Sequence, residues 1–227
     1  MEGISQEAIS LAGSLKLNKL IVFWDDNEIC IDGPTSMTTI ENQSARFKAS
    51  GWHVQGIDGH DKDAIAEAIE AAQKTKKPSL IACKTKIGFG APTKEGTAAT
   101  HGAPLGDDEI AAARENLGWP HAPFDIPNSI LNAWREVGGR GAAIRQDWEG
   151  RLEKSRKKKE FKRLTAGELP KGWQAALNVH KKAVSAEAPG WATRKASGEA
   201  LAVLTGVIPE MIGGSADLTG SVNTKTP

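Results

Sequence analysis

The chain has 227 residues, and 29 basic residues against 28 acidic ones leave it a net charge of +1. A charge this close to balance gives no reason to expect nucleic acid or an anionic membrane as a partner. No apolar run reaches the roughly 18 residues of a membrane span, and no signal-peptide pattern opens the chain. The composition therefore predicts a cytoplasmic globular protein with neither of these partners.

Strands and helices alternate up to about Gly118. The sequence predicts strands over 19–24, 52–58 and 79–85, and helices over 3–15, 39–51, 61–77 and 107–119. Asp107 or Asp108 is expected to cap the last of these helices. Alternation of this kind favours an α/β fold with a parallel sheet and right-handed crossovers.

The first predicted strand is an apolar run that leads into Asp25, Asp26 and Asn27. This pattern is typical of a buried strand with a polar loop at its carboxyl end, which is where open α/β sheets bind ligands. Mg2+ prefers oxygen ligands and completes its shell with waters and substrate phosphates. The side chain of Asn27 and the carbonyl of Ile29 are therefore candidate metal ligands, unless these residues only form the turn that ends the strand.

Residues 87–106 form a glycine-rich segment that is too irregular for a helix or a strand. A loop of this length in a compact domain is usually functional or disordered. His101 lies in this loop, within the sequence THGAPLG. On its own, such a histidine is either a solvated or structural residue or a group that binds a ligand.

The character of the sequence changes after Pro120. In residues 151–164, RLEKSRKKKEFKRL, basic residues outnumber the two glutamates, which could indicate a nucleic-acid patch. Asp147, Glu149 and the nearly neutral whole chain favour a solvated helix face on a connector instead. Further along, the sequence predicts a helix over 192–208 and a short strand within 209–218.

Five separated segments carry a family resemblance: residues 1–13, 25–35, 84–106, 191–201 and 213–224. They closely resemble segments of transketolase, and they occur in that family's order. The resemblance implies a partial thiamine-diphosphate-binding fold with a parallel sheet, a helical linker and the start of a second α/β domain. Residues 1–118 would be the later part of the diphosphate-binding domain, 119–188 the linker, and 189–227 the start of the pyrimidine-binding domain.

The resemblance also implies an activity. Transketolases transfer a two-carbon ketol unit from a ketose phosphate donor to an aldose phosphate acceptor, in the pentose phosphate pathway and in Calvin-type sugar interconversion. Their cofactors are thiamine diphosphate and Mg2+, for which Ca2+ or another divalent ion can stand in. Family members are homodimers, so the resemblance implies a homodimer for the full-length protein.

Several residues match functional positions of the family. Asn27 and the Ile29 carbonyl match metal ligands, and His101 matches a residue that contacts the cofactor diphosphate and the substrate. Glu2 matches an acidic residue in a network that crosses the dimer interface beside the cofactor.

Three further matches lie near the end of the chain. Arg194 and Ser221 match positions that hold the sugar phosphate, and a guanidinium and a hydroxyl suit phosphate oxygens. Asp217 matches a position near the cofactor at the subunit interface. Without the resemblance, Arg194 would be a surface arginine of a helix and Asp217 a turn former or N-cap.

In the family, a Gly-Asp-Gly turn precedes the segment that matches MEGIS, and the catalytic glutamate lies beyond the position of Pro227. We therefore expect an internal segment of a transketolase that is inactive by itself, with at most weak affinity for diphosphate or Mg2+. One alternative is another thiamine-diphosphate ketol transferase, such as dihydroxyacetone synthase or deoxyxylulose-phosphate synthase. The other is a stand-alone, non-catalytic remnant that acts as an interaction module.

Overall fold

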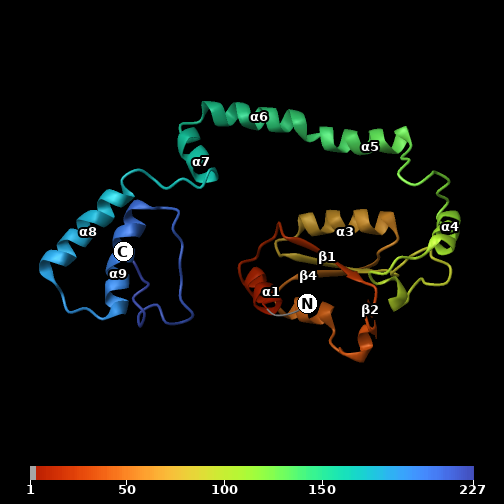
Figure 1. Ribbon diagram of the computed structural model, residues 1–227, viewed down its shortest axis with the longest axis horizontal. Helices are drawn as coiled ribbons and strands as arrows, with labels where there is room; N and C mark the ends of the chain where they lie inside the picture. The colour runs from red at the N-terminus through yellow and green to blue at the C-terminus, as the bar shows by residue number, and fades with distance from the viewer. Residues whose placement is uncertain (1–3) are drawn as a thin grey trace. The chain divides into compact units, whose positions relative to one another are not determined.

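A computed structural model describes residues 4–227 of the chain. They fall into two compact units, the first ending at Ile126 and the second running from Pro127 to Pro227 (Figure 1). Among the described residues, every helix is too short or too polar to cross a lipid bilayer. The division of the sequence into residues 1–118, 119–188 and 189–227 stays a prediction.

The first unit is built on a three-stranded parallel sheet. Its strands are β1 (Ile21–Asp26), β4 (His53–Asp58) and β5 (Ser79–Lys84), in the order β1-β5-β4. In this register Asp26 and Asp58 both lie opposite Lys84, so the three carboxyl ends are level with one another. The predicted α/β class and parallel sheet are confirmed.

Helices cover both faces of this sheet. Helices α1 (Ser5–Ser14) and α2 (Gln43–Ala49) lie on one face, and α3 (Lys62–Lys74) lies on the other (Figure 1). A hydrophobic core lies on each face of the sheet. Adjacent residues of β5 belong to different cores, because side chains alternate along a strand. Leu80 packs with α1 and α2, and Ile81 packs with α3.

The α1 and α2 side has the larger side chains. Phe47 and Trp52 meet edge to face with ring centroids 4.9 Å apart, and the Trp52 indole N–H donates to the Ile9 carbonyl at 2.9 Å. The α3 side contains Ala68, Ala72 and the free thiol of Cys83. Burial raises the pKa of that thiol.

The expectation that β1 is buried is wrong for the described chain. β1 is an edge strand, paired with β5 on one side only, and its Phe23 side chain is 48% exposed. The strand that is buried along almost its whole length is β5, which has a neighbour on each side and helices on both faces. Both strands are apolar in sequence, so hydrophobicity alone does not identify the central one.

The helix starts depend on capping side chains. Asn42 accepts a hydrogen bond from the Ala45 N–H, and α2 therefore begins later than the expected residue 39. Asp61 caps α3. The expected cap of α4 (Asp107–Asn116) is wrong, because Gly106 occupies the N-cap at φ 92° and both aspartates lie in the first turn.

Short elements complete the first unit. β2 (Ile29–Cys30) and β3 (Gly33–Pro34) form a small antiparallel hairpin after β1. A 3-10 turn, η1 (Thr35–Met37), follows the hairpin. A second one, η2 (Ala98–Thr100), lies within the long loop, so the expected irregularity of residues 87–106 is confirmed.

The second unit is helical. Its elements are α5 (Asn128–Gly139), α6 (Gly141–Lys154), α7 (Lys158–Thr165), α8 (Trp173–Glu187) and α9 (Thr193–Val207). The charged segment forms the end of α6 and most of α7, largely exposed, as expected of a solvated helix face.

Apolar contacts link the helices of this unit. α8 packs against α9. Trp148 of α6 contacts Phe161 of α7 with ring centroids 5.5 Å apart. The neighbouring apolar side chains of this segment differ in exposure: Leu152, Leu164, Leu169 and Trp173 range from half-buried to exposed.

The strand expected within residues 209–218 is wrong. This segment is irregular. A strand is stable only when a second strand satisfies its backbone groups, and every regular element described after Pro127 is a helix.

Candidate functional site

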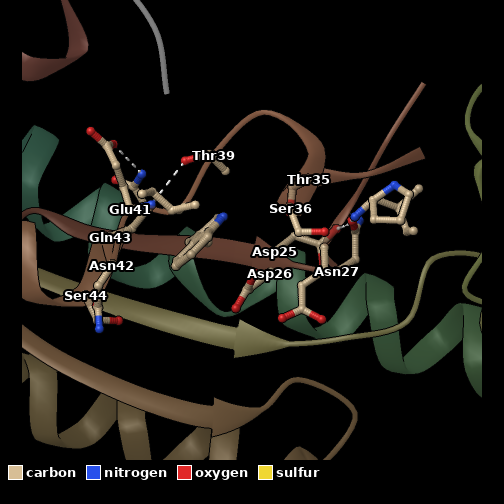
Figure 2. A pocket seen from close by; sticks show the side chains of 15 residues that line it. Asp25, Asp26, Asn27, Thr35, Ser36, Thr39, Glu41, Asn42, Gln43 and Ser44 are labelled. Atoms are coloured by element: carbon tan, nitrogen blue, oxygen red, sulfur yellow. Dashed lines mark hydrogen bonds between the residues drawn. The ribbon is translucent and has the colours of Figure 1, made fainter. Parts of the chain in front are cut away.

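A polar cavity of about 760 Å3 opens at the carboxyl end of β1. Its walls come from the end of β1, the β2–β3 hairpin and the segment between η1 and α2. Figure 2 shows Asp25, Asp26 and Asn27 on one side and Glu41 to Ser44 on the other. A second cavity of about 940 Å3 lies over the ends of β4 and β5 and shares Asp26 and Ser44 with the first.

Asn27 is fixed in a tight turn by its own side chain. Its amide oxygen accepts the Ile29 N–H at 3.0 Å, and its amide nitrogen donates to Asp25 Oδ2 at 3.2 Å. Glu28, between them, has φ 61°, a left-handed conformation that such a turn requires. The turn that was the alternative to a metal site therefore exists, and it leaves the amide oxygen with a second lone pair.

The Ile29 carbonyl lies in the same turn. In the β2–β3 hairpin, Ile29 is paired with Pro34. Proline has no N–H, so the residue opposite cannot donate to this carbonyl. Asn27 and Ile29 thus offer two neutral oxygen atoms two residues apart, which suits a hard cation that takes its remaining ligands from phosphate and water.

The carboxylates around this turn are held by the end of β5. The Lys84 ammonium is 2.5 Å from Glu28 Oε1 and 3.9 Å from Asp26 Oδ2. Asp25 accepts a hydrogen bond from the Thr85 hydroxyl. Among residues 4–227, no three His, Cys, Asp or Glu side chains cluster in a way that could hold a metal ion. A cation here would therefore depend on the amide and carbonyl oxygens together with an anionic ligand.

Sequence reasoning missed Lys84 and Thr85. The signal was available, because parallel strands end at one edge of a sheet and Lys84 and Thr85 are the last residues of the third predicted strand. The polar residues of 35–44 were also missed, and their pattern of Thr, Ser, Asn and Gln indicates only a loop.

His101 lies at the end of η2 in the long loop and is exposed. It lines neither of the two cavities above. The loop around it is held by Glu109 of α4, which accepts the Thr93 hydroxyl at 2.7 Å and the N–H groups of Thr93 and Lys94 at 2.8 and 3.0 Å. These hydrogen bonds, the Thr93 hydroxyl first, hold the pKa of Glu109 below its ordinary value.

Arg194 and Ser221 lie in the second unit, at the start of α9 and in the turn that follows Leu218. Gly198 is one helical turn after Arg194, on the same face of α9. A Cβ at Gly198 would lie within 3 Å of the Asn223 backbone oxygen and Cβ, so the turn that contains Ser221 packs closely on this face. Both side chains are exposed.

The other two expected positions are less defined. Asp217 is exposed and has φ 59°, in a short turn where its N–H donates to the Ser215 carbonyl at 3.0 Å. Its role as a turn former is therefore present in the structure. Glu2 lies outside the described residues.

An α/β unit with a polar cavity at the carboxyl edge of a parallel sheet defines a ligand-binding protein of the open-sheet class. The family model "Transketolase, thiamine diphosphate binding domain" matches residues 1–170. The chain is 52% identical over 99% of its length to transketolase of Sinorhizobium medicae and 51% identical over its full length to that of Cereibacter sphaeroides. The chain belongs to the transketolase family.

Solved structures agree with this assignment. Transketolase from Pichia stipitis, in complex with sedoheptulose-7-phosphate, matches the whole chain with a TM-score of 0.86 and 39% identity. The chain spans about a third of the length of these relatives: 32% and 34% of the two curated proteins and 34% of the Pichia chain.

Proposed function

We propose that this chain contributes the metal- and diphosphate-binding part of a transketolase active site. The observation that carries the proposal is the turn after β1, in which the Asn27 amide oxygen accepts the Ile29 N–H and Ile29 lies opposite Pro34, a residue without an N–H to donate. The proposed cation is Mg2+, for which Ca2+ can substitute. Its remaining ligands would be phosphate oxygens and water.

The chemistry at the reacting carbon belongs to thiamine diphosphate, which supplies a stabilised carbanion when it is bound. The residues of this chain would bind and orient. Asn27 and Ile29 hold the metal, and His101 donates to the diphosphate and to the substrate. Asp217 and Glu2 would lie near the cofactor at the interface of a homodimer.

We further propose sugar phosphates, a ketose donor and an aldose acceptor, as the substrates. The complex of the Pichia enzyme with sedoheptulose-7-phosphate supports this class. The guanidinium of Arg194 and the hydroxyl of Ser221 would hold the phosphate, and this remote binding would orient the reacting carbon. Such a reaction has its place in the cytoplasm, in the pentose phosphate pathway or a Calvin-type interconversion.

The metal proposal can be tested with Mn2+, a paramagnetic ion with ligand preferences close to those of Mg2+. We expect substoichiometric Mn2+, added with thiamine diphosphate, to broaden the backbone amide NMR signals of residues 27–30 before signals elsewhere in the first unit. Excess Mg2+ should restore these signals. Broadening centred on another part of the unit, or none at millimolar cofactor, would contradict the proposal.

A further inference from the structure

The loop that carries His101 leaves the sheet beside a histidine that no part of the proposed function uses. His60 lies in the turn between β4 and α3. Its ring nitrogen Nε2 accepts the Lys86 backbone N–H at 3.0 Å. Its ring is also stacked on Phe89, with centroids 4.0 Å apart and an interplanar angle of 21°. His60 therefore contacts the loop at its first residues in two different ways.

The turn that holds His60 is itself fastened to β5. The His60 N–H donates to Asp58 Oδ1 at 2.9 Å, and the Gly59 N–H donates to the Lys84 carbonyl at 2.8 Å. A Cβ at Gly59 would collide with the side chain of Thr85, so only glycine permits this close approach. The imidazole is thus presented to the loop from a well-defined position.

The first half of the loop is closed on itself beside this contact. The Gly96 N–H donates to the Ile87 carbonyl at 2.8 Å. Glu95 accepts the Gly90 N–H at 2.8 Å and the Lys86 ammonium at 3.0 Å, and these bonds, Gly90 first, lower its pKa. Residues 86–96 therefore form one hydrogen-bonded segment, and His60 is its attachment to the neighbouring turn.

We propose that His60 is a positioning residue for the loop that carries His101, acting through the Lys86 N–H and the ring of Phe89. The inference rests on the proposed function, in which this loop contacts the cofactor. Accepting at Nε2 requires a neutral imidazole with its proton on Nδ1. A protonated imidazole has two donors and no acceptor, so acid removes the bond to Lys86 and loosens the start of the loop.

Charged groups of both signs surround the imidazole. Asp58 lies at the end of β4 and Asp26 at the end of β1, and both line the same cavity as His60. Lys84 and Lys86 line that cavity from the end of β5. Glu95 lies in the loop, where its carboxylate accepts a hydrogen bond from the Lys86 ammonium. The acid response must therefore be measured against a variant that keeps these neighbours.

Amide hydrogen exchange of Lys86, measured by NMR on the 227-residue chain, tests the attachment. Because a single hydrogen bond contributes a modest net free energy, we expect His60→Phe, which keeps an aromatic ring but has no acceptor, to exchange about fivefold faster or more. His60→Gln places an acceptor oxygen near the position of Nε2 and should stay within about threefold of the wild type. Unchanged exchange in His60→Phe would overturn the attachment.

The pH dependence separates this role from simple packing. Relative to the intrinsic exchange rate at each pH, protection of Lys86 should fall on acidification in the wild type and stay level in His60→Gln. A parallel fall in both proteins would assign the effect to the carboxylates around the ring and overturn the role of the imidazole.

The effect on His101 completes the test. With thiamine diphosphate and Mg2+ added, the ring signals of His101 should shift in the wild type and shift less in His60→Phe. Equal shifts in the two proteins would overturn the positioning role and leave the proposed function intact. If the His101 ring signals of the wild type do not shift, the proposed role of His101 is contradicted. In that case the amide exchange of Lys86 still tests whether His60 attaches the loop.

Discussion

At the scale of single residues, the side chain of Asn27 has both a structural role and a proposed ligand role. Its amide oxygen closes the turn by accepting the Ile29 N–H, and Asn27 lines the cavity, where we propose that the same oxygen binds the metal. The amide nitrogen binds Asp25, which settles the orientation of the amide. An aspartate here would face Asp25, Asp26 and Glu28, so the neutral amide avoids adding a fourth carboxylate.

Replacing Asn27 should therefore remove metal binding. We expect Asn27→Ala to abolish the selective Mn2+ broadening of residues 27–30, because the variant loses a ligand and the hydrogen bond that shapes the turn. The measurement is the NMR titration with Mn2+ and thiamine diphosphate.

Asn18→Ala is the matched control, because Asn18 is an exposed asparagine before β1. In this variant, Mn2+ should broaden the signals of residues 27–30 as it does in the wild type. Selective broadening that persists in Asn27→Ala would show that the ion binds at another place.

At the scale of elements, β5 is central to the stability of the first unit because it contributes buried side chains to both hydrophobic cores. Ile81 is fully buried between β5 and α3. Ile81→Ala should lower the free energy of unfolding by about 2–5 kcal/mol, because the substitution removes buried methyl groups and leaves a cavity. Denaturant unfolding followed by tryptophan fluorescence, to which the buried Trp52 contributes, measures this change.

Ile40→Ala makes the same chemical change at a fully exposed position of the same unit. It should alter the free energy of unfolding by less than about 0.5 kcal/mol. Equal losses in the two variants would mean that β5 is not the centre of the core.

Most elements of the first unit could be predicted from sequence. Alternating apolar segments identify the three strands and their helices, and side-chain caps such as Asp61 set the helix starts. Strand order could not be predicted, since β1 and β5 are both apolar and pairing between distant segments decides which is central. The prediction of a strand within residues 209–218 was wrong for the same reason. An apolar run forms a strand only where a second strand pairs with it, and local sequence does not show whether one does.

The candidate site was predictable in part. Asn27 and Ile29 follow from the oxygen-rich end of an apolar strand. The contribution of Lys84 depends on the register of β5 against β1, which local patterns do not specify. The attachment of the loop by His60 joins residues 26 positions apart and has no local signal.

In the second unit, an ion cluster ties α7 to the chain after α9. The Arg163 side chain is only 13% exposed and contacts Glu210 and Glu160, each at 2.6 Å. Their bonds to Arg163 hold the pKa of both carboxyls below the ordinary value of 4.5. A lowered pKa in the folded state gives stability that is present above the unfolded value and lost as the carboxyls are protonated.

The melting temperature of the second unit should therefore fall as the pH drops below about 4.5. The Glu210→Gln variant should have a lower melting temperature than the wild type near neutral pH. Its melting temperature should also fall less than that of the wild type on acidification. Glu187→Gln, at the exposed end of α8, is the control and should follow the wild-type curve. Thermal unfolding by circular dichroism at a series of pH values measures the difference. Parallel curves for all three proteins would show that the cluster adds nothing to stability.

At the scale of the whole molecule, the positions matched to cofactor and substrate fall in two separate units. Asn27, Ile29 and His101 belong to the first, and Arg194 and Ser221 belong to the second. In the proposed function, each group binds its ligand locally. Catalysis needs both groups around one substrate, together with a group that activates the cofactor.

We expect the purified 227-residue chain to show no ketol transfer, because it spans only about a third of the length of the transketolases it matches. The measurement is a coupled assay with xylulose 5-phosphate and ribose 5-phosphate at saturating thiamine diphosphate and Mg2+, with transketolase of Sinorhizobium medicae as the positive control. Selective Mn2+ broadening without turnover is the combined result that the proposed function requires of this chain. Turnover that survives further purification and is lost in Asn27→Ala would show instead that residues 1–227 hold a complete active site, and the acid–base group would then have to be sought among the carboxylates beside Lys84.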